Sequence, residues 1–134
     1  MAKKQFVNPP GLKPLGMYTQ VTTARDCTLA FISGQVAVDS NGKTVGAGNI
    51  RAQAVQVFEN LKLALEAVGA TFADVIKFTI FITDLTPEKR KAVMDVRASY
   101  ISKVNPPAAT MIGIHRLVQE DLMLEIEAVA AIEK

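Results

Sequence analysis

Two glutamates near the end of the chain stand where a carboxyl group could take part in acid–base chemistry. Glu125 lies within a stretch whose alternate residues are apolar, which predicts a strand with one buried face. Partial burial would raise the pKa of its carboxyl and make it a usable general acid or base near neutral pH. Glu127 projects from the same face, about 7 Å further along the strand. From the pattern alone, the simpler interpretation is that both glutamates face solvent.

Arg97 interrupts the apolar stripe of a predicted helix. The other members of this stripe are Val93, Val96, Tyr100, Ile101 and Val104. A guanidinium at such a position extends outward to solvent, pairs with a carboxylate, or binds an anionic ligand. Extension to solvent is the commonest of the three outcomes. A carboxylate partner would be more specific, because it matches the forked geometry of the arginine.

Other kinds of reactive site have little support in the sequence. His115, the single histidine, has no cysteine, aspartate or histidine at the spacing of metal ligands, so we expect no metal site. No serine or cysteine lies in a nucleophile elbow. Gly46 and Gly48 precede a predicted helix but lack the third glycine of a dinucleotide-binding motif. Cys27, the single cysteine, begins a predicted buried strand and is interpreted as structural.

The charge balance argues against binding to nucleic acid. The 134 residues carry 15 basic and 13 acidic side chains, a net charge of +2, and no basic stripe is visible. The dense basic cluster at 89–91 is interpreted as a solvated helix face. No stretch approaches the ~18 apolar residues of a membrane span. Because no apolar run follows the N-terminal lysines, we expect a cytoplasmic protein.

Hydrophobic periodicity predicts strands and two helices within a single domain, residues 1–134. The first 17 residues are rich in proline and glycine, which predicts an extended lead-in. The predicted strands cover residues 18–22, 27–38 and 75–83 and two stretches after Pro107. The predicted helices, with apolar side chains at three- and four-residue spacing, cover residues 49–68 and 86 to about 103.

Capping residues mark the ends of the predicted helices. Asn49 can cap the first helix and Gly69 can take the left-handed conformation after it, while Thr86 and Pro87 can begin the second. Two helices covering the apolar face of a sheet predict an α/β (α+β) two-layer sandwich. The strand over 27–38 is apolar on both faces, so we expect it to be buried on both sides. The other face of the sheet is mixed in polarity, as in a face that meets another subunit.

Six segments, in order, resemble the YjgF/Rid family. They are NPPGLKPLGMYTQ, FISGQV, EAVGATFADVIK, FTIFITDL, VRASY and PPAATMIGIHRL…LEIEAVA. The resemblance implies a chorismate-mutase-like fold and a homotrimer, with the sheets lining a central barrel and three pockets at the subunit interfaces. It further implies hydrolysis of reactive imines and enamines to 2-keto acids and ammonia, with no metal or cofactor.

The resemblance assigns roles to individual positions. Glu125, the first glutamate of the LEIEA ending, matches the family's glutamate that positions the attacking water. Tyr18 matches a pocket tyrosine, and Ser33 and Gly34 lie in the matching Ser-Gly-Gln segment. By this resemblance Glu125 is a pocket residue and not a solvated strand residue.

The sequence departs from the family where the family holds its substrate. Ala109 stands at the position of the arginine that binds the substrate carboxylate, and Thr110 follows in place of serine. Met111 stands where a cysteine is frequent, and Arg97 where the deaminase branch commonly has an asparagine. Our hypothesis is that Arg97 supplies the missing cation from another wall of the pocket. The alternative is that Arg97 pairs with Glu125 or another acid.

The sequence therefore predicts a cofactor-independent hydrolase that acts on an imine or a related C=N metabolite. The expected partner is a small anionic or imine metabolite. Because of Ala109, we expect weak or absent activity on the smallest imino acids. The alternative is a non-catalytic trimer that binds or senses a small metabolite. Endoribonuclease activity has been claimed for relatives. That activity fits poorly with a net charge of +2 and the lack of tryptophan in this chain.

Overall fold

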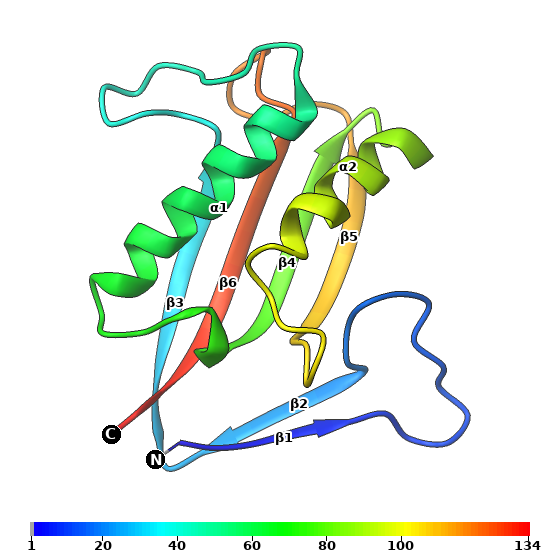
Figure 1. Ribbon diagram of the computed structural model, residues 1–134, viewed down its shortest axis with the longest axis vertical. Helices are drawn as coiled ribbons and strands as arrows, with labels where there is room; N and C mark the ends of the chain where they lie inside the picture. The colour runs from blue at the N-terminus through cyan, green and yellow to red at the C-terminus, as the bar shows by residue number, and fades with distance from the viewer. Residues whose placement is uncertain (1) are drawn as a thin grey trace.

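Two helices lie side by side on one face of a four-stranded sheet, and a two-stranded ribbon crosses one end of it (Figure 1). The computed structural model describes residues 2–134. Its elements are β1 (Lys3–Val7), β2 (Val21–Arg25), β3 (Cys27–Val36), α1 (Ile50–Glu66), the 3₁₀ helix η1 (Phe72–Asp74), β4 (Val75–Thr83), α2 (Pro87–Arg97), β5 (Ala108–Ile114) and β6 (Leu124–Glu133). The predicted two-layer α+β sandwich is confirmed.

The sheet is mixed, with the strand order β3-β6-β4-β5. β6 runs antiparallel to both β3 and β4, and β5 runs parallel to β4. A parallel neighbour requires a crossover connection, which α2 provides by returning the chain over the face of the sheet. As a result, α2 covers β4 and the edge strand β5, whereas α1 covers β3 and β6 (Figure 1).

The predicted helix starts are confirmed by their capping contacts. The Ala52 amide donates to Oδ1 of Asn49 (3.0 Å) at the start of α1, and the Lys89 amide donates to Oγ1 of Thr86 (3.2 Å) at the start of α2. These bonds satisfy amides that have no partner within the helix. After α1, Gly69 takes the predicted left-handed conformation, with φ of 72°.

The predicted end of the second helix is wrong, because α2 stops at Arg97. The Tyr100 amide donates to the Arg97 carbonyl in a tighter turn (2.9 Å), and this turn directs Ile101 into the core. The chain then returns to the sheet, and Val104 is left 75% exposed instead of continuing the apolar stripe. The requirement to reach β5 therefore overrides the helical periodicity.

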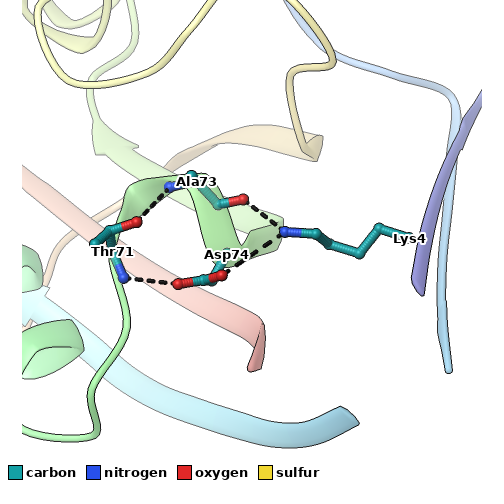
Figure 2. Close-up of polar contacts among 4 residues, drawn as sticks. All are labelled: Lys4, Thr71, Ala73 and Asp74. Atoms are coloured by element: carbon teal, nitrogen blue, oxygen red, sulfur yellow. Dashed lines mark hydrogen bonds and ion pairs between the residues drawn. The ribbon is translucent and has the colours of Figure 1, made fainter. Parts of the chain in front are cut away.

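The N-terminal region also differs from the prediction. The extended lead-in contains β1, which pairs antiparallel with β2. The predicted strand at 18–22 is displaced, because Tyr18 belongs to a compact turn and β2 begins at Val21. Lys4 fastens the ribbon to η1: its Nζ donates to the Ala73 carbonyl (2.8 Å) and lies 3.8 Å from Asp74, as Figure 2 shows.

The core lies between the helices and the inner face of the sheet. Its largest side chains include Phe58, Leu61, Phe78, Ile80, Leu124 and Ile126. On the outer face, Leu29 is 48% and Phe31 is 77% exposed. The prediction that the strand at 27–38 is buried on both sides is therefore wrong for the single chain. Its outer face is apolar but open, a pattern typical of a surface covered by another subunit.

Candidate functional site

A cavity of about 240 Å³ lies between α2, the β4–β5 edge of the sheet and the loop that joins β1 to β2. Residues 15–18 of this loop, Ile80, Arg90, Met94, Arg97, Ala109 and Met111 form its walls. A larger cavity of about 470 Å³ beside β1 contains Lys4, but that lysine is already bound to Ala73 and Asp74. The smaller cavity holds the more unusual chemical group and is the candidate site.

Arg97 is the unusual group. Its side chain is 1% exposed, and its Nε and Nη2 have no hydrogen-bond partner among residues 2–134. Nη1 lies 4.0 Å from Sδ of Met94, and the guanidinium carbon is 5.8 Å from the centre of the Phe78 ring. Burial lowers the pKa of Arg97 to about 10, which leaves the group charged at neutral pH. Within the single chain, Arg97 therefore does not extend to solvent, and no carboxylate of residues 2–134 pairs with it.

β5 contributes a small and apolar wall to the cavity. Ala109 pairs with Phe78 of β4, and Met111 pairs with Ile80. Since Phe78 and Ile80 are buried beneath the helices, paired residues on β5 also face the helices. The predicted pocket residues Ala109 and Met111 therefore lie on the same side of the sheet as Arg97.

The loop between β1 and β2 closes the cavity. The Leu15 amide donates to Oη of Tyr18 (3.0 Å), and the Thr19 amide donates to the Pro107 carbonyl (3.2 Å) just before β5. These bonds hold Tyr18 against the cavity, where it forms part of the wall. Arg90 stands at the mouth, where a Cβ added to Gly16 would lie 3.2 Å from its Nη2.

Glu125 lies on the opposite face of the sheet. It pairs with Phe81 of β4 and Val36 of β3, on the face away from the helices. Its carboxyl lies over Gly34, where a Cβ would be 2.6 Å from Cδ of Glu125 and 2.8 Å from Cγ. Gly34 falls within the register irregularity of β3, so a glycine there makes room for the carboxyl. Burial, and after it the charge of Glu127, raises the pKa of Glu125.

The predicted site residues thus form two groups. One group lines the cavity beneath α2 and consists of Tyr18, Arg97, Ala109 and Met111. Glu125, Gly34 and Thr110 belong to the outer face, where Oγ1 of Thr110 accepts a hydrogen bond from Lys77 (2.8 Å); Ser33 is exposed on β3. Because the sheet separates the groups, Arg97 and Glu125 of one chain do not meet.

The sequence interpretation missed Arg90 as a residue of the cavity and treated it as part of a solvated cluster. The signal for it is spacing, because Arg90 precedes Arg97 by seven residues and so lies on the same helix face two turns earlier. Ile80 and Met94 were also missed, since apolar residues carry no mark that separates a cavity wall from a core.

Within the described residues, metal binding and membrane insertion find no structural support. Across residues 2–134, no three His, Cys, Asp or Glu side chains are grouped so that they could hold a metal ion. His115 follows β5 and is exposed. No helix in this described part of the chain is long and apolar enough to cross a membrane.

Residues 10–132 match the family model described as endoribonuclease L-PSP. A RutC family protein of Pyrococcus horikoshii is 36% identical over 118 residues, 88% of this chain and 89% of that protein. A protein of Dermatophagoides farinae named 2-iminobutanoate/2-iminopropanoate deaminase is 30% identical, across 99% of this chain and 100% of its own length. The crystal structure of the Rid family protein YyfB from Yersinia pestis, of unknown function, matches with a TM-score of 0.87 and 31% identity, covering 96% of this chain and 98% of that one.

Proposed function

The chain belongs to the endoribonuclease L-PSP family, which is the YjgF/Rid family, and from that premise we propose that it hydrolyses an imine C=N bond without a cofactor. In this reaction water adds to the carbon of a protonated imine, the C–N bond breaks, and a ketone and an ammonium ion are released. The reaction needs a group that takes a proton from the water and delivers it to the departing nitrogen.

The observation that carries this proposal is the close contact between the carboxyl of Glu125 and Gly34. The close approach leaves no space for a side chain at position 34 and holds the carboxyl at one place on the sheet. Burial raises the pKa of Glu125, and a base whose pKa is nearer neutrality also serves better as the acid in the next step. Glu125 would therefore orient the water and transfer its protons.

The cation of the same site is Arg97, and it comes from a second subunit. The sheet separates Arg97 from Glu125 within one chain, so a complete site requires the outer face of one subunit to meet the cavity of its neighbour. The open apolar surface around Leu29 and Phe31 supplies a contact for such an assembly. A ring of three chains would contain three equal sites of this kind.

The substrate differs from that of a typical deaminase of the family. The resemblance places the carboxylate-binding arginine at position 109, where this chain has alanine. The relative from Dermatophagoides farinae is named for the four- and three-carbon imino acids. With the cation on α2 instead of β5, these short molecules would not present their C=N bond to Glu125 in the same orientation. We therefore expect weak or absent activity on both.

The test is hydrolysis of a panel of 2-imino acids, generated in situ from amino acids by an amino-acid oxidase and followed by ammonia release. Glu125→Gln should lower the rate on the best substrate at least about 100-fold, the range of a positioned acid–base group. Glu127→Gln is the matched control when rates are compared at a pH above the acid limb of the profile, because Glu127 lies on the same strand and is exposed. Equal rates for Glu125→Gln and the wild type would refute the role of Glu125.

A second candidate function is binding of a metabolite without catalysis. The buried and unpartnered Arg97 favours it, because an anion would be held there whether or not hydrolysis follows. This alternative predicts no turnover on any member of the panel, and a Glu125→Gln protein that keeps its ligand and its biological role.

A further inference from the structure

Two amide side chains of α1 bind the backbone of the two strands that meet at Glu125. Gln53 and Asn60 are seven residues apart in the sequence and therefore lie on one face of the helix, two turns apart. We propose that they are positioning residues for Glu125, with Gln53 fixing the start of β6 and Asn60 the end of β3. They lie on the helix side of the sheet and act through the backbone. This inference rests on the proposed function for the reaction at Glu125.

Gln53 is fully buried, and both of its polar atoms are hydrogen-bonded. Its Oε1 accepts a hydrogen bond from the Met123 amide (2.8 Å). Its Nε2 donates to the carbonyls of Asp121 (2.8 Å) and Gly46 (3.2 Å). These bonds join the loop before α1 to the segment that leads into β6. Because Met123 precedes Glu125 by two residues, the bond to its amide fixes where β6 begins on the sheet.

Asn60 holds the end of β3 in a similar way. Its Nδ2 donates to the carbonyls of Val36 and Val38 (3.0 Å each). Its Oδ1 accepts a hydrogen bond from Nε2 of Gln56 (2.9 Å), which orients the amide. Val36 is the residue of β3 that pairs with Glu125. The side chain of Asn60 therefore fixes the backbone directly opposite the proposed acid–base group.

The pairing of β3 with β6 is irregular near this point, so its register needs support. Between Ile32 and Gln35, β3 has two residues where β6 has one. This β-bulge places Gly34 under the carboxyl of Glu125. Closing the bulge would shift one strand against the other by a residue and put a different residue under the carboxyl. β3 is an edge strand, so one neighbouring strand sets its register, and the bonds from α1 add a second constraint.

The test uses two variants of the full-length protein that keep the size of the side chain. Asn60→Leu and Gln53→Met remove the amide hydrogen bonds and bury no new charge. On the best imino-acid substrate, each should lower kcat by about 10- to 100-fold with KM little changed, because a carboxyl displaced by about 1 Å loses its alignment with the reacting atoms. Thr22→Val is the control. It removes a bond of the same kind, from Oγ1 of Thr22 to the Ile76 carbonyl near the start of β4 (2.7 Å), and should leave kcat unchanged.

A second readout reports the position of the carboxyl without turnover. The titration of Glu125 is followed by ¹³C NMR of its labelled carboxyl, assigned by the loss of its signal in Glu125→Gln. Burial raises the pKa of Glu125, so a carboxyl released from Gly34 should titrate at lower pH. The residues paired with it, Val36 and Phe81, carry no charge, and Glu127 is unchanged in every variant. A shift of this pKa therefore reports movement of the carboxyl.

The outcomes separate this inference from the proposed function. The pKa of Glu125 should fall in Asn60→Leu and Gln53→Met and stay as in the wild type in Thr22→Val. Asn60→Ser and Gln53→Asn, which shorten the side chain and keep it polar, replace either variant that does not fold by circular dichroism. An unshifted pKa in the folded variants would overturn the inference, whatever the rates of hydrolysis. If the wild type hydrolyses no imino acid, the proposed function fails, and a lowered pKa in the variants still supports the positioning.

Discussion

Mixing two inactive variants should restore part of the activity, because the two halves of the proposed site come from different chains. Arg97→Met removes the cation, and Glu125→Gln removes the acid–base group. Each pure variant should be inactive on the best substrate. In a mixed oligomer, a chain that carries intact Glu125 can face a neighbour that carries intact Arg97, and a complete site forms between them.

The expected recovery follows from the symmetry of the assembly. In a ring, every site takes its glutamate from one chain and its arginine from the next. With equal amounts of the two variants assembled at random, about one quarter of all sites are complete, and a ring of three that contains both variants has one complete site out of about three. If both groups acted within one chain, no site would be complete, whatever the mixture.

The two variants are co-expressed with different affinity tags, and the mixed oligomers are isolated over both columns and assayed for ammonia release. A mixture of Arg97→Met with the double variant Arg97→Met/Glu125→Gln is the control, because it contains no intact Arg97 and should stay inactive. Activity at the control level in the test mixture would refute the shared site. Light scattering on the same sample should give the mass of a trimer.

Three further outcomes follow from the structure. Glu127→Gln should move the acid limb of the kcat/KM profile to lower pH. The ionised carboxylate of Glu125 is lost as pH falls through its pKa, and the charge of Glu127 raises that pKa. An unmoved limb would contradict this prediction. Arg97→Met should raise the free energy of unfolding in urea by up to about 3 kcal/mol at constant protein concentration. The reason is that burial lowers the pKa of Arg97 from 12.5 to about 10, so that below this pH the buried charge destabilises the folded protein. A less stable variant would count against this explanation. Gly34→Ala should lower kcat by about 100-fold, because the Cβ of the new alanine would displace the carboxyl of Glu125. Circular dichroism should show that the variant stays folded. An unchanged kcat would argue against the position of the Glu125 carboxyl over Gly34.

The parts of the fold that depend on local chemistry were predictable from the sequence. The start of α1 at Asn49, the start of α2 at Thr86 and the strand at Val75–Thr83 all follow from caps or from side-chain periodicity. The end of α2 was not predictable in this way, because the turn after Arg97 is set by the path to β5. β1 was missed since its partner strand lies beyond a long loop, and pairing of this kind leaves no local signal.

The sequence singled out several residues that the structure places around the cavity, but it did not give their arrangement. Arg97 stood out because a charge interrupted an apolar stripe, yet the sequence did not distinguish among its three outcomes. That choice depends on what lies opposite, and the neighbours are Phe78 and Met94 instead of a carboxylate. Alternation along β5 and β6 indicated two faces for each strand. Only the register of β4 with both strands places Ala109 and Glu125 on opposite sides.

The structure also indicates why a cation at position 97 and one at position 109 are alternatives. Ala109 pairs with Phe78, and the guanidinium of Arg97 lies over the ring of that same residue. An arginine at 109 would therefore bring a second guanidinium into the space beside the first. Two such charges 4 Å apart repel by about 4 kcal/mol at an effective dielectric constant of about 20. The cavity thus accommodates one buried cation, and under the proposed function a cation on α2 would hold an acid from a different direction than a cation on β5.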